Sequence, residues 1–192
     1  MKPFNRFLHS RAARRHVGFT LLEMLVVIAI VGILAAVAAP SLVEMLRNNR
    51  LQAAQAALQQ SLNLARSEAT KRGSGALVSI AANTSSNVWS NGWTVFTGLP
   101  ADVSAAVAPT DSTRLEVVPA FTGGSIGYGQ TGGLTYFTYN GQGRVVTSTG
   151  ATGARSFWFV ESTSKKYCVI VNITGRVRTT SVVNTSSDSD CV

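Results

Sequence analysis

An apolar stretch near the N-terminus, residues 18–40, constrains this chain more than any other feature. Residues 24–39 carry no charged or hydrogen-bonding side chain. Residues 19–39 number 21, close to the ~20 that a helix needs to cross a bilayer. A basic leader precedes them, and positive charge ahead of an apolar span keeps that flank in the cytoplasm. The sequence therefore predicts one membrane-spanning helix, with the following chain on the far side of the membrane.

A single charge, Glu23, interrupts the apolar stretch. Three interpretations compete: a secretory signal peptide cut near Ala36-Val37-Ala38, an ordinary membrane anchor, and a cleaved leader followed by a retained helix. The first two do not explain a carboxylate, which costs up to ~2.5–3.5 kcal/mol near the bilayer centre. In the third, cleavage after Gly18 creates an amino group on Phe19, one helical turn from Glu23 of its own chain or near that of a neighbouring subunit. Such pairing neutralises both charges and favours the third interpretation.

The same residues carry a family resemblance. The run Gly18-Phe19-Thr20-Leu21-Leu22-Glu23, followed by apolar residues, resembles the class III leader of type IV pilins and type II secretion pseudopilins. The resemblance implies that a prepilin peptidase cuts after Gly18 and methylates the amino group of Phe19. It also implies that Glu23, at the fifth mature position, supports filament assembly with other pilins. Pro40, at the twenty-second mature position, is a further feature of that family.

The high net charge belongs largely to the leader. The whole chain has a formal charge of +8, but residues 1–18 hold five basic residues and no acidic one. The 12 basic and 9 acidic residues that remain do not by themselves indicate a nucleic-acid partner. Both histidines, His9 and His16, lie in the leader, so the mature chain has none for catalysis or metal binding. We therefore expect no enzyme activity, no cofactor and no metal site.

Past Pro40 the helical period continues and becomes amphipathic, with apolar residues recurring at spacings of three and four between Leu51 and Ala69. Because Pro40 cannot donate its backbone hydrogen bond, a kink or local melting is expected there. Gly73 is a natural residue to follow the end of the helix at Arg72. The predicted organisation is a leader over residues 1–18, a helix over 19–72 (transmembrane over 19–39, amphipathic over 40–72) and a head over 73–192.

After Gly73 the composition changes to Gly, Ser, Thr and Val, in short alternating runs separated by turn signals such as Asn91-Gly92. These runs predict strands over residues 76–81, 89–96, 114–118, 134–139, 156–160, 167–173 and 177–182. Residues 101–113 are expected to form a loop. Short strands after one long helix predict an α+β fold, with the helix packed on a mostly antiparallel β-sheet head.

The chain has two cysteines, Cys168 and Cys191, both in the part expected outside the cytoplasm. That compartment is oxidising, which favours a disulfide between them. The alternative is one buried thiol and one exposed thiol.

Three segments of the head carry a second resemblance: Trp89…Gly92-Trp93-Thr94-Val95-Phe96, Phe137…Asn140-Gly141-Gln142-Gly143 and Cys168…Gly175-Arg176-Val177-Arg178. Together they are similar to the GspH/FimT family. This family contains minor pseudopilins of the type II secretion system and minor pilins of type IV pili.

Arg176 and Arg178 are two residues apart, so in an extended strand they project from the same face. Gly175 lets the backbone turn just before them. Arginine binds phosphate well, and Lys165 and Lys166, which precede the neighbouring strand, are candidates to extend the patch. The GRxR pattern resembles that of FimT-type pilins, which bind DNA during natural transformation. The resemblance implies sequence-independent contacts with the phosphates of double-stranded DNA.

The two arginines also fit roles that involve no DNA. They could keep an edge strand soluble, or pair with Glu161, Asp188 or Asp190. The rival function is structural: a GspH-like pseudopilin of type II secretion, or a FimU-like tip subunit that primes pilus assembly, without DNA binding. Either function places the protein in the bacterial inner membrane as a single-pass protein with a periplasmic head, and then in a pilus or pseudopilus filament.

Overall fold

The computed structural model describes residues 18–83, 89–99, 113–121, 127–130, 136–146, 154–161, 165–183 and 191. These residues form one long helix, one short 3-10 helix and nine strands. The chain divides into two compact units, Met1–Leu42 and Val43–Val192.

Helix α1 covers Leu21–Arg72. Its first turn is closed by a reciprocal pair of hydrogen bonds. The Glu23 N–H donates to Thr20 Oγ1 at 3.2 Å, and the Thr20 N–H donates to Glu23 Oε2 at 3.4 Å. This is a capping box, in which Thr20 is the N-cap residue. The helix therefore begins two residues later than the predicted Phe19, and the Thr-x-x-Glu spacing is the sequence signal for that start.

The first unit holds the apolar part of α1. Every large apolar side chain of residues 19–42 is exposed. Among the described residues, α1 is the one helix long and apolar enough to cross a membrane. The helix is continuous through Pro40, and the Ser41 hydroxyl donates to Ala38 O at 2.9 Å. The local melting expected as one outcome of Pro40 does not occur.

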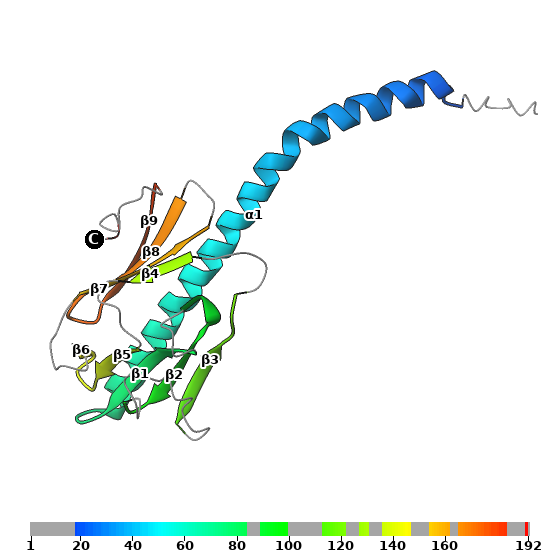
Figure 1. Cartoon of the computed structure of the whole chain (residues 1–192). Helices are drawn as coiled ribbons and strands as arrows, with labels where there is room; N and C mark the ends of the chain where they lie inside the picture. The colour runs from blue at the N-terminus through cyan, green and yellow to red at the C-terminus, as the bar shows by residue number, and fades with distance from the viewer. Residues whose placement is uncertain are drawn as a thin grey trace, which may run out of the picture. The chain divides into compact units, whose positions relative to one another are not determined.

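In the second unit, two antiparallel sheets pack on the C-terminal half of α1 (Figure 1). The first sheet has the strand order β3-β2-β1-β5-β6, and the second has the order β4-β7-β8-β9. The strands are β1 Leu77–Ala82, β2 Trp93–Thr97, β3 Arg114–Val118, β4 Gly127–Gln130, β5 Tyr136–Asn140, β6 Val145–Val146, β7 Arg155–Val160, β8 Lys165–Val171 and β9 Val177–Val183. One helix on antiparallel sheets confirms the predicted α+β class.

The main differences from the predicted strands have local causes. Residues Trp89–Asn91 form the 3-10 helix η1 and not the start of a strand. The turn is closed by the Gly92 N–H, which donates to Trp89 O at 3.1 Å, and Gly92 has a φ of 85°. Strands β4 and β6 are additional to the predicted ones, and most of the predicted loop over residues 101–113 lies outside the described residues.

One hydrophobic core joins the helix to both sheets. Apolar side chains of α1 at spacings of three and four are fully buried; they are Leu51, Ala54, Leu58, Leu62, Ala65 and Ala69. They pack against the inner faces of the two sheets. A polar contact crosses the same interface, because the Trp93 indole N–H donates to Ser61 Oγ at 2.9 Å and the Ser61 hydroxyl donates to Glu116. The apolar face of the helix thus contacts both sheets, and Ser61 adds a polar contact with the first sheet.

Candidate functional site

The Gly175-Arg176-Val177-Arg178 segment lies at the β8–β9 hairpin, where Asn172 closes the turn. The Gly175 N–H donates to Asn172 O at 2.9 Å, and the Asn172 N–H donates to Arg176 O at 3.1 Å. The Arg176 N–H donates to the Asn172 side chain, at 2.9 Å from Oδ1. Gly175 has a φ of 79°, in the left-handed region that favours glycine. Asn172 and Gly175 together determine where Arg176 leaves the turn.

Arg176 and Arg178 project from the same face of the second sheet, on the side opposite the core. Val177, between them, packs against the core, whereas both arginines are exposed. Arg178 is opposite Ile170 on β8, which is opposite Ser156 on β7. Among the ion pairs between described residues, none involves either arginine.

A cavity of about 520 Å³ lies beside this arginine pair. Its described lining residues are Ala154, Ser156, Ile170, Asn172, Arg176 and Arg178. The pair thus borders a hollow on the outer face of the sheet. A hollow with two guanidinium groups at its border suits an anionic group.

Lys165 and Lys166 lie at the other end of β8. They are opposite Val183 and Val182, whereas Arg176 precedes β9 and Arg178 is its second residue. Ile170, the residue opposite Arg178, lies five positions along β8 from Lys165, about 16 Å of extended strand. Lys166 is also buried, with Nζ 5.9 Å from the centre of the Trp158 ring. The structure corrects the expectation that the lysines extend the patch, because only the end of β8 next to the turn lies beside the start of β9.

The acidic residues considered as partners of the arginines have different positions. Glu161 Oε1 lies 3.8 Å from Arg47 Nε, and Glu161 follows the end of β7 that is opposite Lys166. Glu161 is therefore far along the sheet from the arginine pair. Asp188 and Asp190 lie outside the described residues.

One helix side chain, Arg66, joins the two sheets at their hairpins. Its Nε donates to Gly143 O, in the β5–β6 turn, at 3.1 Å, and its Nη2 donates to Thr174 O, in the β8–β9 turn, at 3.2 Å. The Tyr139 hydroxyl donates to Gly175 O at 3.4 Å. Burial raises the pKa of Tyr139 above its ordinary value of 10.0, although the Arg66 cation acts to lower it. The sequence does not single out Arg66, because the residue is one of several on the polar face of an amphipathic helix.

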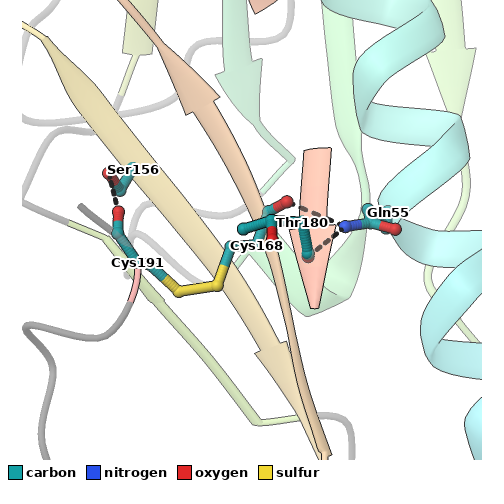
Figure 2. Close-up of a disulfide and its surroundings, with 5 residues drawn as sticks. All are labelled: Gln55, Ser156, Cys168, Thr180 and Cys191. Carbon is teal, nitrogen blue, oxygen red and sulfur yellow. Dashed lines mark hydrogen bonds between the residues drawn. A yellow bond between two sulfur atoms is a disulfide. The ribbon is translucent and has the colours of Figure 1, made fainter. Parts of the chain in front are cut away.

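Cys168 and Cys191 form a disulfide with a Cα–Cα distance of 5.7 Å (Figure 2). Cys168 belongs to β8, and the Ser156 hydroxyl of β7 donates to Cys191 O at 2.6 Å. On the helix side, Gln55 Nε2 donates to both Cys168 O and Thr180 O, each at 2.8 Å. The disulfide therefore fixes the C-terminal end of the chain to the sheet that carries the arginine pair.

At the N-terminus, Gly18 precedes the capped first turn of α1. A Cβ on Gly18 would meet no described atom within 4 Å, and Phe19 is 76% exposed. The fold of the described residues thus gives no packing reason for a glycine at this position.

A long helix, apolar in its N-terminal half and packed by its other half on antiparallel sheets, defines a pilin-like subunit of a pilus or pseudopilus. The chain belongs to the GspH/FimT-type minor pilin family: the model of the type II transport protein GspH matches residues 54–175, and a prokaryotic N-terminal methylation motif matches residues 14–39.

Two crystal structures of the type IV minor pilin FimU from Pseudomonas aeruginosa (strain PAO1) have a similar fold. The first, in space group P21, has a TM-score of 0.54 and 20% sequence identity, and the match covers 73% of this chain and 92% of the FimU chain. The second, in space group P65, has a TM-score of 0.53 and 19% identity, with 68% and 92% covered. At these identities the likeness shows the fold alone. A comparison with curated protein sequences gives no match.

Proposed function

We propose that this protein is a non-enzymatic minor type IV pilin of the FimT type, which binds double-stranded DNA without sequence preference for uptake in natural transformation. The observation that carries the proposal is the exposed arginine pair, Arg176 and Arg178, on one face of the β8–β9 hairpin. Guanidinium groups bind phosphate oxygens through charge-assisted hydrogen bonds. Contacts with phosphates alone give binding that is independent of sequence and weakened by salt.

The proposal includes the maturation of the N-terminus. A prepilin peptidase cuts after Gly18 and methylates the amino group of Phe19, and Glu23 then supports assembly with other pilins. No described atom lies within 4 Å of the Cβ position of Gly18, so recognition by the peptidase is the reason proposed here for a glycine at this position. The Glu23 carboxylate accepts a hydrogen bond from the N–H of Thr20, the residue after Phe19, which supports pairing with the amino group that cleavage creates on Phe19.

In the mature protein, residues 19–39 span the inner membrane, residues 40–72 form the amphipathic half of the helix, and residues 73–192 form the periplasmic head. The subunit then joins the pilus. The methylation motif over residues 14–39 and the apolar, exposed part of α1 support this placement.

The test is a titration of the full chain, in uncharged detergent micelles, with duplex DNA at several salt concentrations. Log K falls linearly with log salt, and each lost phosphate contact reduces the magnitude of this salt slope by about 0.9. The Arg176→Ala/Arg178→Ala variant is therefore expected to reduce the magnitude of the salt slope by about 1.8 and to bind several-fold more weakly at low salt. The matched control is Lys165→Ala, which removes an exposed cation at the far end of β8 and should keep the wild-type slope.

Equal slopes for the wild type and the double variant would contradict the assignment of the site. Absence of binding by the wild type at low salt would overturn the DNA proposal. It would leave the second candidate: a GspH-like pseudopilin of type II secretion, or a FimU-like tip subunit that primes pilus assembly. The match to the GspH family model and the likeness of fold to FimU favour that candidate as the alternative.

A further inference from the structure

The two hairpins that Arg66 joins share a sequence pattern. Residues 140–145 read Asn-Gly-Gln-Gly-Arg-Val, and residues 172–177 read Asn-Ile-Thr-Gly-Arg-Val. Both follow the pattern Asn-x-x-Gly-Arg-Val. The first copy runs from the last residue of β5 to the first residue of β6, and the second runs from the residue after β8 to the first residue of β9.

The first copy folds in the same way as the second. The Gly143 N–H donates to Asn140 O at 2.8 Å, and the Asn140 N–H donates to Arg144 O at 3.0 Å. The Arg144 N–H donates to Asn140 Oδ1 at 3.0 Å. Gly143 has a φ of 69°. Each bond and the positive φ have a counterpart at Asn172, Gly175 and Arg176, so the two turns present their arginines in the same manner.

The two turns are in contact. A Cβ built on Gly175 would lie 2.0 Å from Gly143 O, and Arg66 donates to both turns. Two Cα–Cα steps of 3.80 Å, with this contact and the bonds on either side of it, place the Cα atoms of Arg144 and Arg176 within about 14 Å of each other. A length of duplex of about 14 Å carries roughly eight negative charges.

The arginine of the first copy faces away from the core. Val145, which follows it, is fully buried in the core, and Arg144 itself is exposed. This alternation is the one seen at Arg176 and Val177. In the part of the chain that the structure describes, Arg144 takes part in no ion pair.

We infer that Arg144 is a third phosphate-binding residue, which extends the arginine pair onto the β5–β6 hairpin of the other sheet. The inference rests on the proposed function, because it assigns a further contact to the same DNA phosphates. Arg66 is a positioning residue for this surface: its two hydrogen bonds hold the turns that carry Arg144 and Arg176 at a fixed separation.

The experiment compares the full-length wild type, Arg144→Ala, Arg176→Ala/Arg178→Ala and the triple variant in micelles with duplex DNA between about 50 and 200 mM salt. Removing Arg144 alone is expected to lower the salt slope by about 0.9, so that binding falls about 3.5-fold less over this fourfold salt range. The triple variant should lose a further ~0.9 relative to the double variant. Lys165→Ala is the charge-matched control. Folding should be unaffected, because the bond of Arg144 to Asn140 uses its backbone N–H, which alanine keeps.

The outcomes separate this inference from the proposed function. A wild-type slope for Arg144→Ala, together with a reduced slope for the double variant, would overturn the inference and leave DNA binding in place. A wild type that does not bind DNA would overturn both. A reduced slope for Arg144→Ala accompanied by a lowered melting temperature would count against a phosphate contact. Arg144→Gln, which keeps the polar side chain without the charge, must then give the same reduced slope at the wild-type melting temperature, or the inference fails.

Discussion

Replacing Gly175 with alanine is expected to lower the free energy of unfolding by about 3–5 kcal/mol. A φ of 79° costs an L-residue roughly 1–2 kcal/mol. The new Cβ would also lie 2.0 Å from Gly143 O and 2.9 Å from Tyr139 Cε1, so the two hairpins would have to separate. Separation breaks the hydrogen bonds from Arg66 to the two turns. Together these contribute about 2–3 kcal/mol, because the bond to Thr174 is exposed. The measurement is urea unfolding of the full chain in micelles, followed by tryptophan fluorescence.

The matched control is Gly73→Ala. Gly73 has a φ of 81°, but a Cβ there would meet no described atom within 4 Å. This variant should therefore show only the backbone cost, roughly 1–2 kcal/mol. Equal losses for the two variants would contradict the role of the contact between the turns.

Removing the disulfide is expected to lower the free energy of unfolding by about 3 kcal/mol. The bond between Cys168 and Cys191 closes a loop with a sequence separation of 23, and in the chain-entropy model a loop of this size stabilises by about that amount. Both cysteines are buried in an apolar cluster with Trp158 and Ile170, so the alanine variants avoid leaving a polar group there. Urea unfolding of Cys168→Ala/Cys191→Ala measures the loss.

The control for the disulfide is chemical reduction. A reductant should destabilise the wild type by a similar amount and leave the double alanine variant unchanged. A wild type that unfolds at the same urea concentration with and without reductant would show that the bond does not stabilise the head. The disulfide packs against Ile170, which also lines the hollow beside the arginine pair. The Cys168→Ala/Cys191→Ala variant therefore also tests whether the disulfide affects DNA binding.

The features that the sequence predicts well are those encoded by neighbouring residues. The apolar period from Leu51 to Ala69 indicates the helix face that the core buries, because periodicity reflects burial directly. The alternation around Val177 correctly predicts that Arg176 and Arg178 share a face, since adjacent strand residues point to opposite sides. The motif at Gly18 and Glu23 indicates the family for the same reason: all its residues are contiguous.

The features that the sequence does not predict depend on pairing between distant segments. Lys165 and Lys166 come shortly before the arginines along the chain, but the register of the β8–β9 hairpin places them at opposite ends of the sheet. Strand β6 has only two residues and exists because it pairs with β5. The turns that carry Arg144 and Arg176 are in contact although they are 32 residues apart in the sequence, and no local pattern encodes that contact.

If, as proposed, the subunit is anchored by its helix and binds DNA at its hairpins, the position of Arg66 has a mechanical consequence. Tension applied to the β8–β9 turn passes through Thr174 O into the Arg66 side chain, and from there directly into the backbone of α1. The Gly143 bond gives the β5–β6 turn the same short route. One residue of the helix therefore connects the turns of both sheets to α1. Each turn is held by this connection as well as by the hydrogen bonds between its own strands.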